Sequence, residues 1–550
     1  MKFEIFDVDA LARIGKIKVN NKEMITPNIF PVIHPYNNII APPELKKLGA
    51  ECLFTNAYII YQNREFREIV QKKGIHTFLN YDGIIATDSG AFQQYMYNNN
   101  NLNLNAKLIE KFQEEIGSDF PVILDIPVQI DDDYKTAKEK VFMTIQRAKD
   151  NIDRRTRSQS HWFGPIHGGR YEDLLKECTI EMIKLDFDVY AIGGLVKAFL
   201  DYRFDFTLNN LLIVKKHITP NKPIHMFGLG LPQFFSLAVA CGCDIMDSAA
   251  YILFAKENRY FTLSTGTKNL DELLEFPCHC PICTNYTPSE IKKLDEESRI
   301  GLLAKHNLYL SFSELRTIRQ AIREGNLWEL VEQRMRIHPN LVKAVRNITP
   351  YQKFFEIYEK IYKNHGRLYA NPESINRPLI FRYEQRIKNN YRAPKNAKYL
   401  LILPELDVKG KNSPNFRQWL NQINNYQINI RMEIHIVLNS TFYGIIPYEL
   451  IDTFPMGQSE SISSYNENDL IYNKSLKRST LFLNLFSKNY EKCGILIPEQ
   501  FLNQFGEIEP FPKNNPIYQL EKVLQKFTKL NYSVFKDLDS ILEFFINNDK

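Results

Sequence analysis

The chain has 550 residues, which at about 150 residues per domain predicts two to four domains, one of which could be a large barrel. Its apolar fraction of 44% and charged fraction of 24% are typical of a globular protein. No apolar run approaches the ~20 residues that a membrane-spanning helix needs, and the N-terminal residues lack the pattern of a secretory signal. Composition therefore excludes the membrane, secreted and disordered classes and favours a cytoplasmic protein.

The net charge of +5 is unevenly distributed along the chain. Residues 301–400 contain 19 Lys and Arg against 8 Asp and Glu, so this segment carries +11 and the rest of the chain −6. A basic segment in an otherwise acidic protein is typical of a polyanion-binding surface. A solvated helical face gives the same pattern, and charge alone does not separate the two interpretations.

Short apolar runs alternate with helical patterns up to about residue 270. Residues 103–117, for example, carry their apolar side chains on one helical face. This alternation predicts parallel strands and a (β/α) fold. The expected strands contain residues 83–87, 122–124, 163–166, 189–192, 225–228 and 243–246.

Candidate site residues follow several of these expected strands. Polar residues at the carboxyl ends of parallel strands are typical of the active site of a (β/α)₈ barrel. A doubly wound sheet is the main alternative, but it would be expected to carry a glycine-rich phosphate loop, and the sequence has no such motif after a strand. The residues concerned are Asp88, Asp125, His167, Gly193, Gly194 and Asp247.

The sequence predicts four segments. Residues 1–270 would form the first part of a (β/α)₈ barrel, and residues 271–346 a mostly helical segment. Residues 347–397 are basic, rich in Tyr and Asn and interrupted by prolines, which predicts a connecting arm. Residues 398–550 contain further apolar runs and would form a smaller C-terminal α/β region.

Three cysteines within six residues give the most specific signal. Cys278, Cys280 and Cys283 are followed by His306 on an expected helix. Three thiolates and one imidazole form a closed tetrahedral shell that suits one structural Zn²⁺ ion. His279 lies inside the cluster, but its neighbours already supply ligands, so it ranks behind His306.

Two aspartates end expected strands. Asp88 and Ser89 stand before Gly90, where a small-residue turn permits close approach to a flat ligand, on which Phe92 could stack. Asp247 ends another strand and is followed by small residues. Two such carboxylates permit glycosidic chemistry, with one as nucleophile and one as acid/base. Each motif also has a structural interpretation, as a helix cap, a turn or a salt bridge.

Together these residues resemble the tRNA-guanine transglycosylase family, and specifically its archaeal branch. The resemblance runs in order from residue 1 to about residue 350, and the combination of motifs is far more specific than any one of them. The motifs are Thr87-Asp88-Ser89-Gly90, Leu124-Asp125-Ile126-Pro127, Ile166-His167-Gly168-Gly169, Ile192-Gly193-Gly194, Asp247-Ser248 and the cysteine cluster with His306.

The resemblance implies a (β/α)₈ TIM barrel in which residues 271–346 form an inserted helical zinc subdomain together with the helices that close the barrel. It also implies an exchange of guanine, at position 15 of archaeal tRNA, for free 7-cyano-7-deazaguanine on the way to archaeosine. Asp247 resembles the nucleophile that attacks the ribose C1′, and Asp88 the general acid/base. Ser89 and Phe92 would contact the base. The polar edge of the base would be recognised by Asp125, His167, Gly193 and Gly194. The nucleotide would be flipped out of its stack, with the basic segment holding phosphates.

Two features depart from the family pattern. The family usually has glutamine where this chain has His167, and the different hydrogen-bonding set of an imidazole bears on base selectivity. Archaeal members usually end in an RNA-binding PUA domain, and residues 451–550, with 13 acidic and 11 basic residues, show no recognisable one. A separate PUA-domain protein would then supply this function, or the tRNA would be bound differently; a homodimer is compatible with either arrangement.

Three alternatives stay open on the sequence. An archaeosine-synthase-like paralogue is disfavoured because both aspartates and the complete cysteine and histidine set are present. A DNA-directed 7-deazaguanine transglycosylase has no sequence feature against it. A non-catalytic tRNA-binding subunit is disfavoured by Asp247, because a retired enzyme need not keep its nucleophile.

Overall fold

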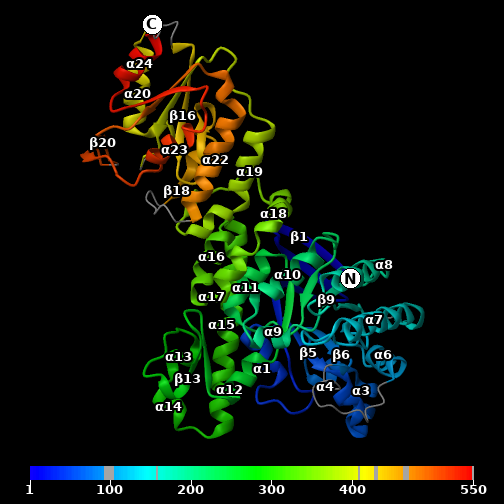
Figure 1. Cartoon of the computed structure of the whole chain (residues 1–550). Helices are drawn as coiled ribbons and strands as arrows, with labels where there is room; N and C mark the ends of the chain where they lie inside the picture. Colours follow the sequence, from blue (N-terminus) through cyan, green and yellow to red (C-terminus); the bar gives the residue numbers. More distant parts are fainter. Residues whose placement is uncertain are drawn as a thin grey trace. The chain divides into compact units, whose positions relative to one another are not determined.

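A computed structural model of the chain describes residues 1–91, 105–156, 159–406, 409–426, 431–461, 470–503 and 505–547. It divides the chain into an N-terminal unit, Met1–Tyr351, and a C-terminal unit, Gln352–Lys550 (Figure 1). Within the described residues, no helix is both long enough and apolar enough to cross a membrane.

The N-terminal unit begins with a three-stranded antiparallel sheet. Its strands β1 (Lys2–Asp9), β2 (Ala12–Val19) and β3 (Lys22–Thr26) pair in sequence order. Apolar side chains of β2 and β3, such as Ile17 and Met24, are buried in the core of the parallel strands that follow. This sheet is a feature that the sequence did not predict.

Among the described residues of this unit, eight parallel strands follow the antiparallel sheet. One sheet has the order β4-β11-β10-β9-β8 and a second has the order β5-β6-β7, and every pairing in both is parallel. Isolated parallel bridges link the two sheets, from Val32 to Phe54 and from Val122 to Phe163. The strands are β4 (Asn28–Pro31), β5 (Cys52–Asn56), β6 (Ile84–Asp88), β7 (Phe120–Pro121), β8 (Phe163–Ile166), β9 (Val189–Ile192), β10 (Ile224–Met226) and β11 (Ile245–Ser248).

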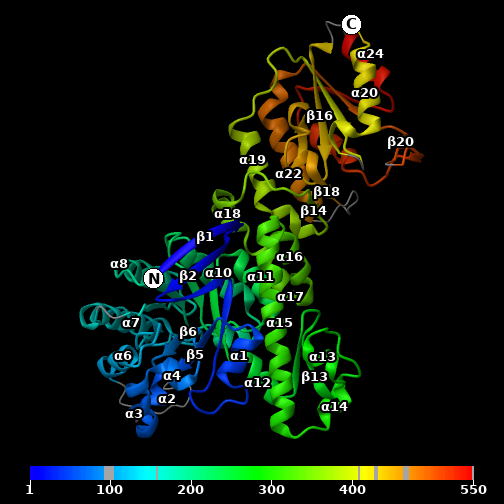
Figure 2. The same cartoon turned by 180° about the vertical axis from the view of Figure 1, so that it is seen from behind.

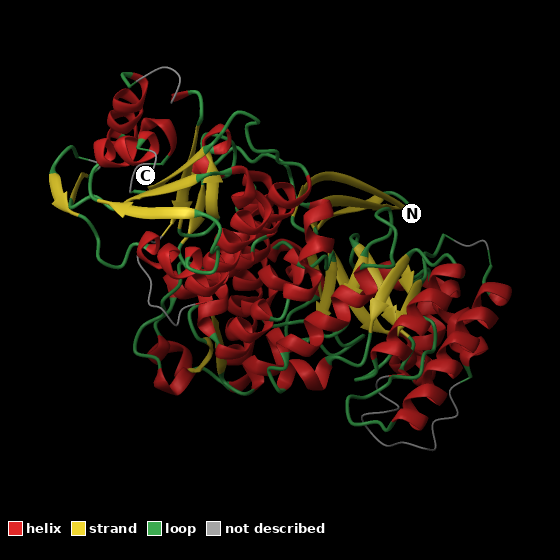
Figure 3. Ribbon diagram, turned by 45° about the horizontal axis from the view of Figure 1, so that its top comes forward, coloured by secondary structure: helices red, strands yellow, loops and turns green. Residues whose placement is uncertain are grey.

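The core of the N-terminal unit lies among these strands. Phe30, Phe54, Phe120 and Phe163 are at most 4% exposed and belong to one apolar cluster that draws on both sheets. Figure 3 shows strands of this unit (yellow) with helices (red) outside them. The outer helices are α1 (Pro42–Leu48), α2 (Ala57–Gln62), α3 (Arg64–Lys73), α4 (Ile75–Leu79), α6 (Ala106–Glu115), α7 (Tyr134–Arg154), α8 (Glu172–Lys184), α9 (Val196–Leu200), α10 (Phe204–Lys215), α11 (Pro232–Ala240) and α12 (Ala250–Lys256).

Most expected strands form close to their predicted positions because alternating apolar runs leave few other ways to bury them. Strands 163–166 and 189–192 have the predicted bounds. The run at 122–124 is shifted, since β7 ends at Pro121 and Val122 makes only a single bridge. The helix predicted within 103–117 forms as α6, which Asn105 caps by accepting a hydrogen bond from the Leu108 amide.

The cysteine cluster lies between a hairpin and a long helix. The hairpin is β12 (Arg259–Thr262) and β13 (Gly266–Asn269), followed by α13 (Pro281–Asn285), α14 (Pro288–Lys292) and α15 (Glu296–Glu324). Figure 2 shows α13, β13 and α14 beside α15. This segment is not purely helical and it begins before residue 271, because the hairpin packs on α15. The helices α16 (Leu327–Arg334) and α17 (Pro339–Arg346) complete the unit.

The C-terminal unit contains a five-stranded mixed sheet. Its order is β17-β16-β15-β19-β22, in which only the pairing of β16 with β17 is antiparallel. The strands are β15 (Tyr399–Pro404), β16 (Ile434–Ser440), β17 (Gly444–Pro447), β19 (Lys492–Leu496) and β22 (Asn531–Phe535), with the short pairs β14 (Arg367–Tyr369) with β18 (Ser459–Ser461) and β20 (Gln500–Leu502) with β21 (Ile508–Pro510). The helices are α18 (Gln352–Tyr358), α19 (Pro378–Asn389), α20 (Pro414–Asn424), α22 (Leu470–Phe486), α23 (Leu520–Leu524) and α24 (Leu538–Ile546).

Residues 347–397 do not form a connecting arm. From Gln352 onward they belong to the C-terminal unit, and Tyr369, Ile380, Tyr383 and Ile387 lie in its apolar core. The prolines and polar residues that suggested an arm start short helices such as α19, whose first residue is Pro378. The apolar residues between them, rather than the polar majority, decide where the segment packs.

Candidate functional site

Asp88 is the last residue of β6 and is half-buried. Its Oδ2 accepts a hydrogen bond of 2.9 Å from Asn56 Nδ2, and its Oδ1 accepts one of 3.3 Å from the Gly90 amide. Asn56 is the register partner of Asp88 on β5, and its own side-chain oxygen caps α2. Ser89 is fully buried and donates to the Ile123 carbonyl over 3.0 Å, which ties the turn to the segment that follows β7.

Asp125 and His167 form a buried pair. Asp125 Oδ2 lies 2.5 Å from His167 Nε2, and the side chains of both residues are at most 9% exposed. Because a carboxylate only accepts hydrogen bonds, Nε2 carries the proton. His167 Nδ1 has no partner among the described residues.

The backbone approaches this pair closely at two glycines. A Cβ atom on Gly193 would lie 2.3 Å from Cε1 of His167, and one on Gly194 would lie 2.1 Å from the Val128 carbonyl oxygen. Gly194 also has a φ of 74°, which favours glycine. Side chains are therefore excluded, and the backbone forms one wall beside the ring.

Asp247 lies on β11, and its two carboxylate oxygens have different hydrogen-bond partners. Oδ1 accepts hydrogen bonds from His225 Nε2 at 2.7 Å and from the Gly228 amide at 3.2 Å. No hydrogen bond from the described residues reaches Oδ2. Asp247 is 9% exposed, so one oxygen is fixed while the carboxylate keeps limited access to its surroundings.

Two hydrogen-bond partners of the aspartates were not predicted from the sequence. Asn56 sits at the end of β5, in the same position after an apolar run as Asp88 on β6, and that parallel could have indicated it. His225 lies inside an apolar run that was interpreted only as a strand. Phe92, expected to stack on the base, lies outside the described residues.

The three aspartates share one end of the parallel strands. Asp88 ends β6, Asp125 follows β7 and Asp247 lies at the carboxyl end of β11, so the parallel pairing places all three at the carboxyl edge. This is where parallel α/β proteins build their sites. The site therefore contains three carboxylates, each with its own side-chain hydrogen-bond partner: Asn56 for Asp88, His167 for Asp125 and His225 for Asp247.

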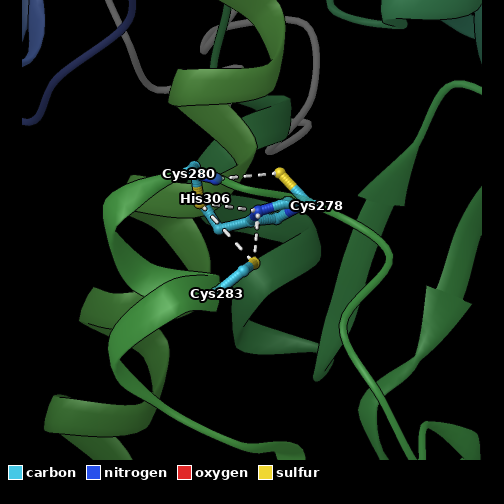
Figure 4. A group of neighbouring side chains, drawn as sticks. All are labelled: Cys278, Cys280, Cys283 and His306. Carbon is cyan, nitrogen blue, oxygen red and sulfur yellow. Dashed lines mark hydrogen bonds between the residues drawn. The ribbon is translucent and has the colours of Figure 1, made fainter.

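The predicted metal ligands meet in one cluster (Figure 4). The ligand atoms of Cys278, Cys280, Cys283 and His306 all lie within 4.8 Å of one another. His306 Nδ1 is 3.4 Å from the sulfur of Cys280 and 3.3 Å from that of Cys283. Three sulfurs and one nitrogen fit a tetrahedral Zn²⁺ ion, so the cluster could bind one zinc ion.

The surroundings of His306 orient it for this role. Its Nε2 lies 3.0 Å from the Phe261 carbonyl oxygen and its ring stacks on Tyr260 with centroids 3.7 Å apart. The ring is 1% exposed. Burial opposes the charged form, but the thiols of Cys278 and Cys280 outweigh it and raise the pKa of His306 to about 9.

Comparison with known proteins shows the family of the chain. Residues 7–340 match the model of the TGT family, described as queuine tRNA-ribosyltransferase. A tRNA-guanine(15) transglycosylase of Methanococcus maripaludis is 36% identical over 536 residues, which cover 95% of this chain and 78% of the relative. Proteins of the same name from Methanocaldococcus jannaschii (38% identity, 84% and 68% coverage) and Pyrococcus abyssi (41% identity, 70% and 65%) are also similar.

The family model and these relatives define a glycosyltransferase of the pentosyltransferase class that modifies tRNA. The chain belongs to the queuine tRNA-ribosyltransferase (TGT) family.

Proposed function

We propose that this enzyme exchanges guanine at position 15 of tRNA for 7-cyano-7-deazaguanine, as a step of archaeosine biosynthesis. The observation that carries the proposal is Asp247, whose Oδ1 is held by two donors while no described residue bonds Oδ2. Relatives at 36–41% identity that carry the name tRNA-guanine(15) transglycosylase support the position in tRNA. Free guanine would leave as 7-cyano-7-deazaguanine enters.

The proposed fold of the N-terminal unit is a (β/α)₈ barrel. Strands β4 to β11 are eight in number and all their pairings are parallel. The bridges Val32–Phe54 and Val122–Phe163 join the two sheets at both edges, as closure of a cylinder requires. The carboxyl end of such a barrel is where its enzymes place their catalytic residues.

In the proposed first step, Asp247 Oδ2 attacks C1′ of the target ribose. The C1′–N9 bond breaks, its electron pair goes to the departing guanine, and Asp88 donates the proton that neutralises the base. The developing oxocarbenium character is stabilised by the Asp247 carboxylate. A covalent aspartyl-ribose ester then links the protein to the RNA.

The second step reverses the first with a different base. Asp88, now a carboxylate, accepts the proton of the incoming base, whose nitrogen attacks C1′ and releases Asp247. Two displacements at one carbon preserve the β configuration. Asn56 and the Gly90 amide both hydrogen-bond Asp88, so they limit the rotation of its carboxyl group.

The base pocket is proposed to consist of Asp125, His167, Ser89 and the Gly193-Gly194 backbone. A guanine-type base presents an N–H and an amino group on one edge, which a carboxylate can accept. The His167 proton is already committed to Asp125, so His167 orients that carboxylate and offers no donor of its own. Phe92 is proposed as the stacking residue.

The basic segment is proposed to contact tRNA phosphates. Arg386, Lys388 and Arg392 are exposed. Arg382 is 7% exposed and bonds Glu356 together with the carbonyls of Lys360 and Glu359, so it is not available to RNA. A separate PUA-domain protein and a homodimer remain proposals for completing the tRNA site.

The test is an exchange assay with labelled base. The full-length protein is incubated with tRNA and labelled guanine or labelled 7-cyano-7-deazaguanine, and duplex DNA of matched length serves as the control. We expect label in tRNA and none in DNA. A tRNA whose residue 15 is adenine should stay unlabelled. Incorporation into DNA, or into the adenine-15 tRNA, would contradict the proposal.

A further inference from the structure

His225 is a buried histidine in an apolar cage. It lies on β10 and is 0% exposed. Four phenyl rings surround it: the ring centroids of Phe227 and Phe163 lie 4.9 and 5.1 Å from its own, and those of Phe30 and Phe54 lie 6.1 and 6.2 Å away. A phenyl side chain would fill this space without any polar atom.

The two ring nitrogens of His225 make only one hydrogen bond with the described residues. Nε2 lies 2.7 Å from Asp247 Oδ1, and Nδ1 has no partner. A proton on Nδ1 would be buried without an acceptor, and it would turn the Nε2 lone pair toward a carboxylate. The ring therefore holds its proton on Nε2 and donates it to Asp247.

This arrangement disfavours folding. A nitrogen buried without a hydrogen bond costs free energy, whereas an apolar ring of similar shape in the same cage would not. Selection for stability alone would thus place phenylalanine at this position. The only compensating contact that the described residues show is the one to Asp247.

We propose that His225 is a positioning residue, which holds Asp247 Oδ1 so that Oδ2 faces the ribose C1′. The inference rests on the proposed role of Asp247 as the nucleophile. His225 and the Gly228 amide bond the same oxygen, so together they fix the rotation of the carboxylate. During attack the C1′–Oδ2 bond forms, the electron pair of the C1′–N9 bond leaves with the base, and His225 keeps its proton throughout.

The His225 bond also acts on the return step. When the incoming base displaces Asp247, negative charge reappears on the carboxylate, and the Nε2 donor stabilises it. Removal of the donor should therefore slow both displacements. It should not change how tightly a free base binds to Asp125, because no described contact joins His225 to that pocket.

The experiment compares His225→Phe with His225→Gln in the full-length protein. Phenylalanine matches the cage but has no donor, whereas a glutamine amide can replace the Nε2 donor. We measure thermal unfolding, kcat and KM for labelled guanine exchange into tRNA, and the rate of protein–RNA adduct formation on denaturing gels. His161→Phe is the matched control, because His161 contacts Asp188 at 3.3 Å just before β8 begins, at the opposite end of the strands.

For His225→Phe we expect an equal or higher Tm, a fall in kcat of about 10- to 100-fold and a KM for guanine within about twofold. His225→Gln should recover at least part of kcat, and His161→Phe should retain wild-type kcat. A wild-type kcat in His225→Phe, or a loss confined to KM, overturns the inference. If His225→Phe does not fold, His225→Leu provides the variant without a donor for the same comparison with His225→Gln.

Asp247→Asn separates this inference from the proposed function. If Asp247→Asn is inactive and His225→Phe has normal kcat, only the positioning role is wrong. If Asp247→Asn exchanges guanine at the wild-type rate, the nucleophile assignment fails, and the role of His225 fails with it.

Discussion

His306 Nε2 lies 3.0 Å from the carbonyl oxygen of Phe261. This contact decides which ring nitrogen faces the cysteines, because a carbonyl oxygen accepts a hydrogen bond only from the ring nitrogen that carries the proton. Nδ1 is therefore left with its lone pair toward the three sulfurs. Phe261 lies on β12, so the hairpin orients a ligand that the long helix α15 supplies.

The first prediction concerns this cluster. Cys280→Ser should lower zinc content from one per chain and lower the Tm of the N-terminal unit, because a closed structural site contributes its binding free energy to folding. Metal content is measured by atomic emission and stability by calorimetry. Cys493→Ser, a buried cysteine of the C-terminal unit, should keep full metal content. Full zinc occupancy in Cys280→Ser would show that the ligand set is wrong.

The second prediction separates the two carboxylates. Asp247→Asn should abolish exchange and any covalent protein–RNA adduct, because an amide cannot form the ester with C1′. Asp88→Asn should slow turnover by ~10²–10⁴-fold, the usual contribution of acid–base assistance, while a residual adduct still accumulates. Denaturing gels with labelled tRNA report both results. Adduct in Asp247→Asn and none in Asp88→Asn would exchange the two roles.

The third prediction concerns base selectivity. His167→Gln can keep the hydrogen bond to Asp125 through its amide N–H and adds a carbonyl acceptor in place of Nδ1. We expect KM for the free base to change by up to about tenfold, with kcat within about threefold of wild type. Steady-state kinetics with guanine and 7-cyano-7-deazaguanine as competing bases measures the change in preference. A large fall in kcat with unchanged KM would instead place His167 in the chemical step.

The fourth prediction concerns tRNA affinity. Reversing the charges of Arg386, Lys388 and Arg392 should weaken tRNA binding. It should also reduce the slope of log K against log salt concentration, because a protein that contacts fewer phosphates releases fewer counterions from the tRNA when it binds. Filter binding at several salt concentrations gives the slope. An unchanged slope would mean that these side chains form only a solvated surface.

Arg382→Gln provides the contrast for that experiment. Its guanidinium is buried and bonds Glu356 at 2.7 Å and three backbone carbonyls, so its loss should destabilise the C-terminal unit by about 1–3 kcal/mol. We expect lower stability to urea with little effect on the salt slope. The two sets of variants therefore distinguish basic residues that face solvent from one that supports the fold.

The sequence alone located the cluster of candidate metal ligands and placed the three aspartates at the carboxyl ends of strands. Cys278, Cys280 and Cys283 lie within six residues, so a single loop can bring their thiols together. A set of three thiolates and one histidine is typical of a structural zinc site. Asp88, Asp125 and Asp247 could be predicted because each stands at or just after an apolar run, and parallel strands carry such residues to one edge. These signals are local, so they needed no knowledge of which strands are neighbours.

Only the tertiary structure decided how these residues are supported. His225 lies inside an apolar run, where nothing local indicates that its ring reaches Asp247 on the neighbouring strand. The charge pattern likewise cannot tell Arg382, which bonds buried carbonyls, from exposed Arg386 four residues later. The prolines of residues 347–397 indicated an arm, but long-range burial of Tyr369 and Tyr383 placed that segment in a core. Burial and pairing across distant strands depend on the whole chain, whereas ligand spacing and strand ends are written in a few consecutive residues.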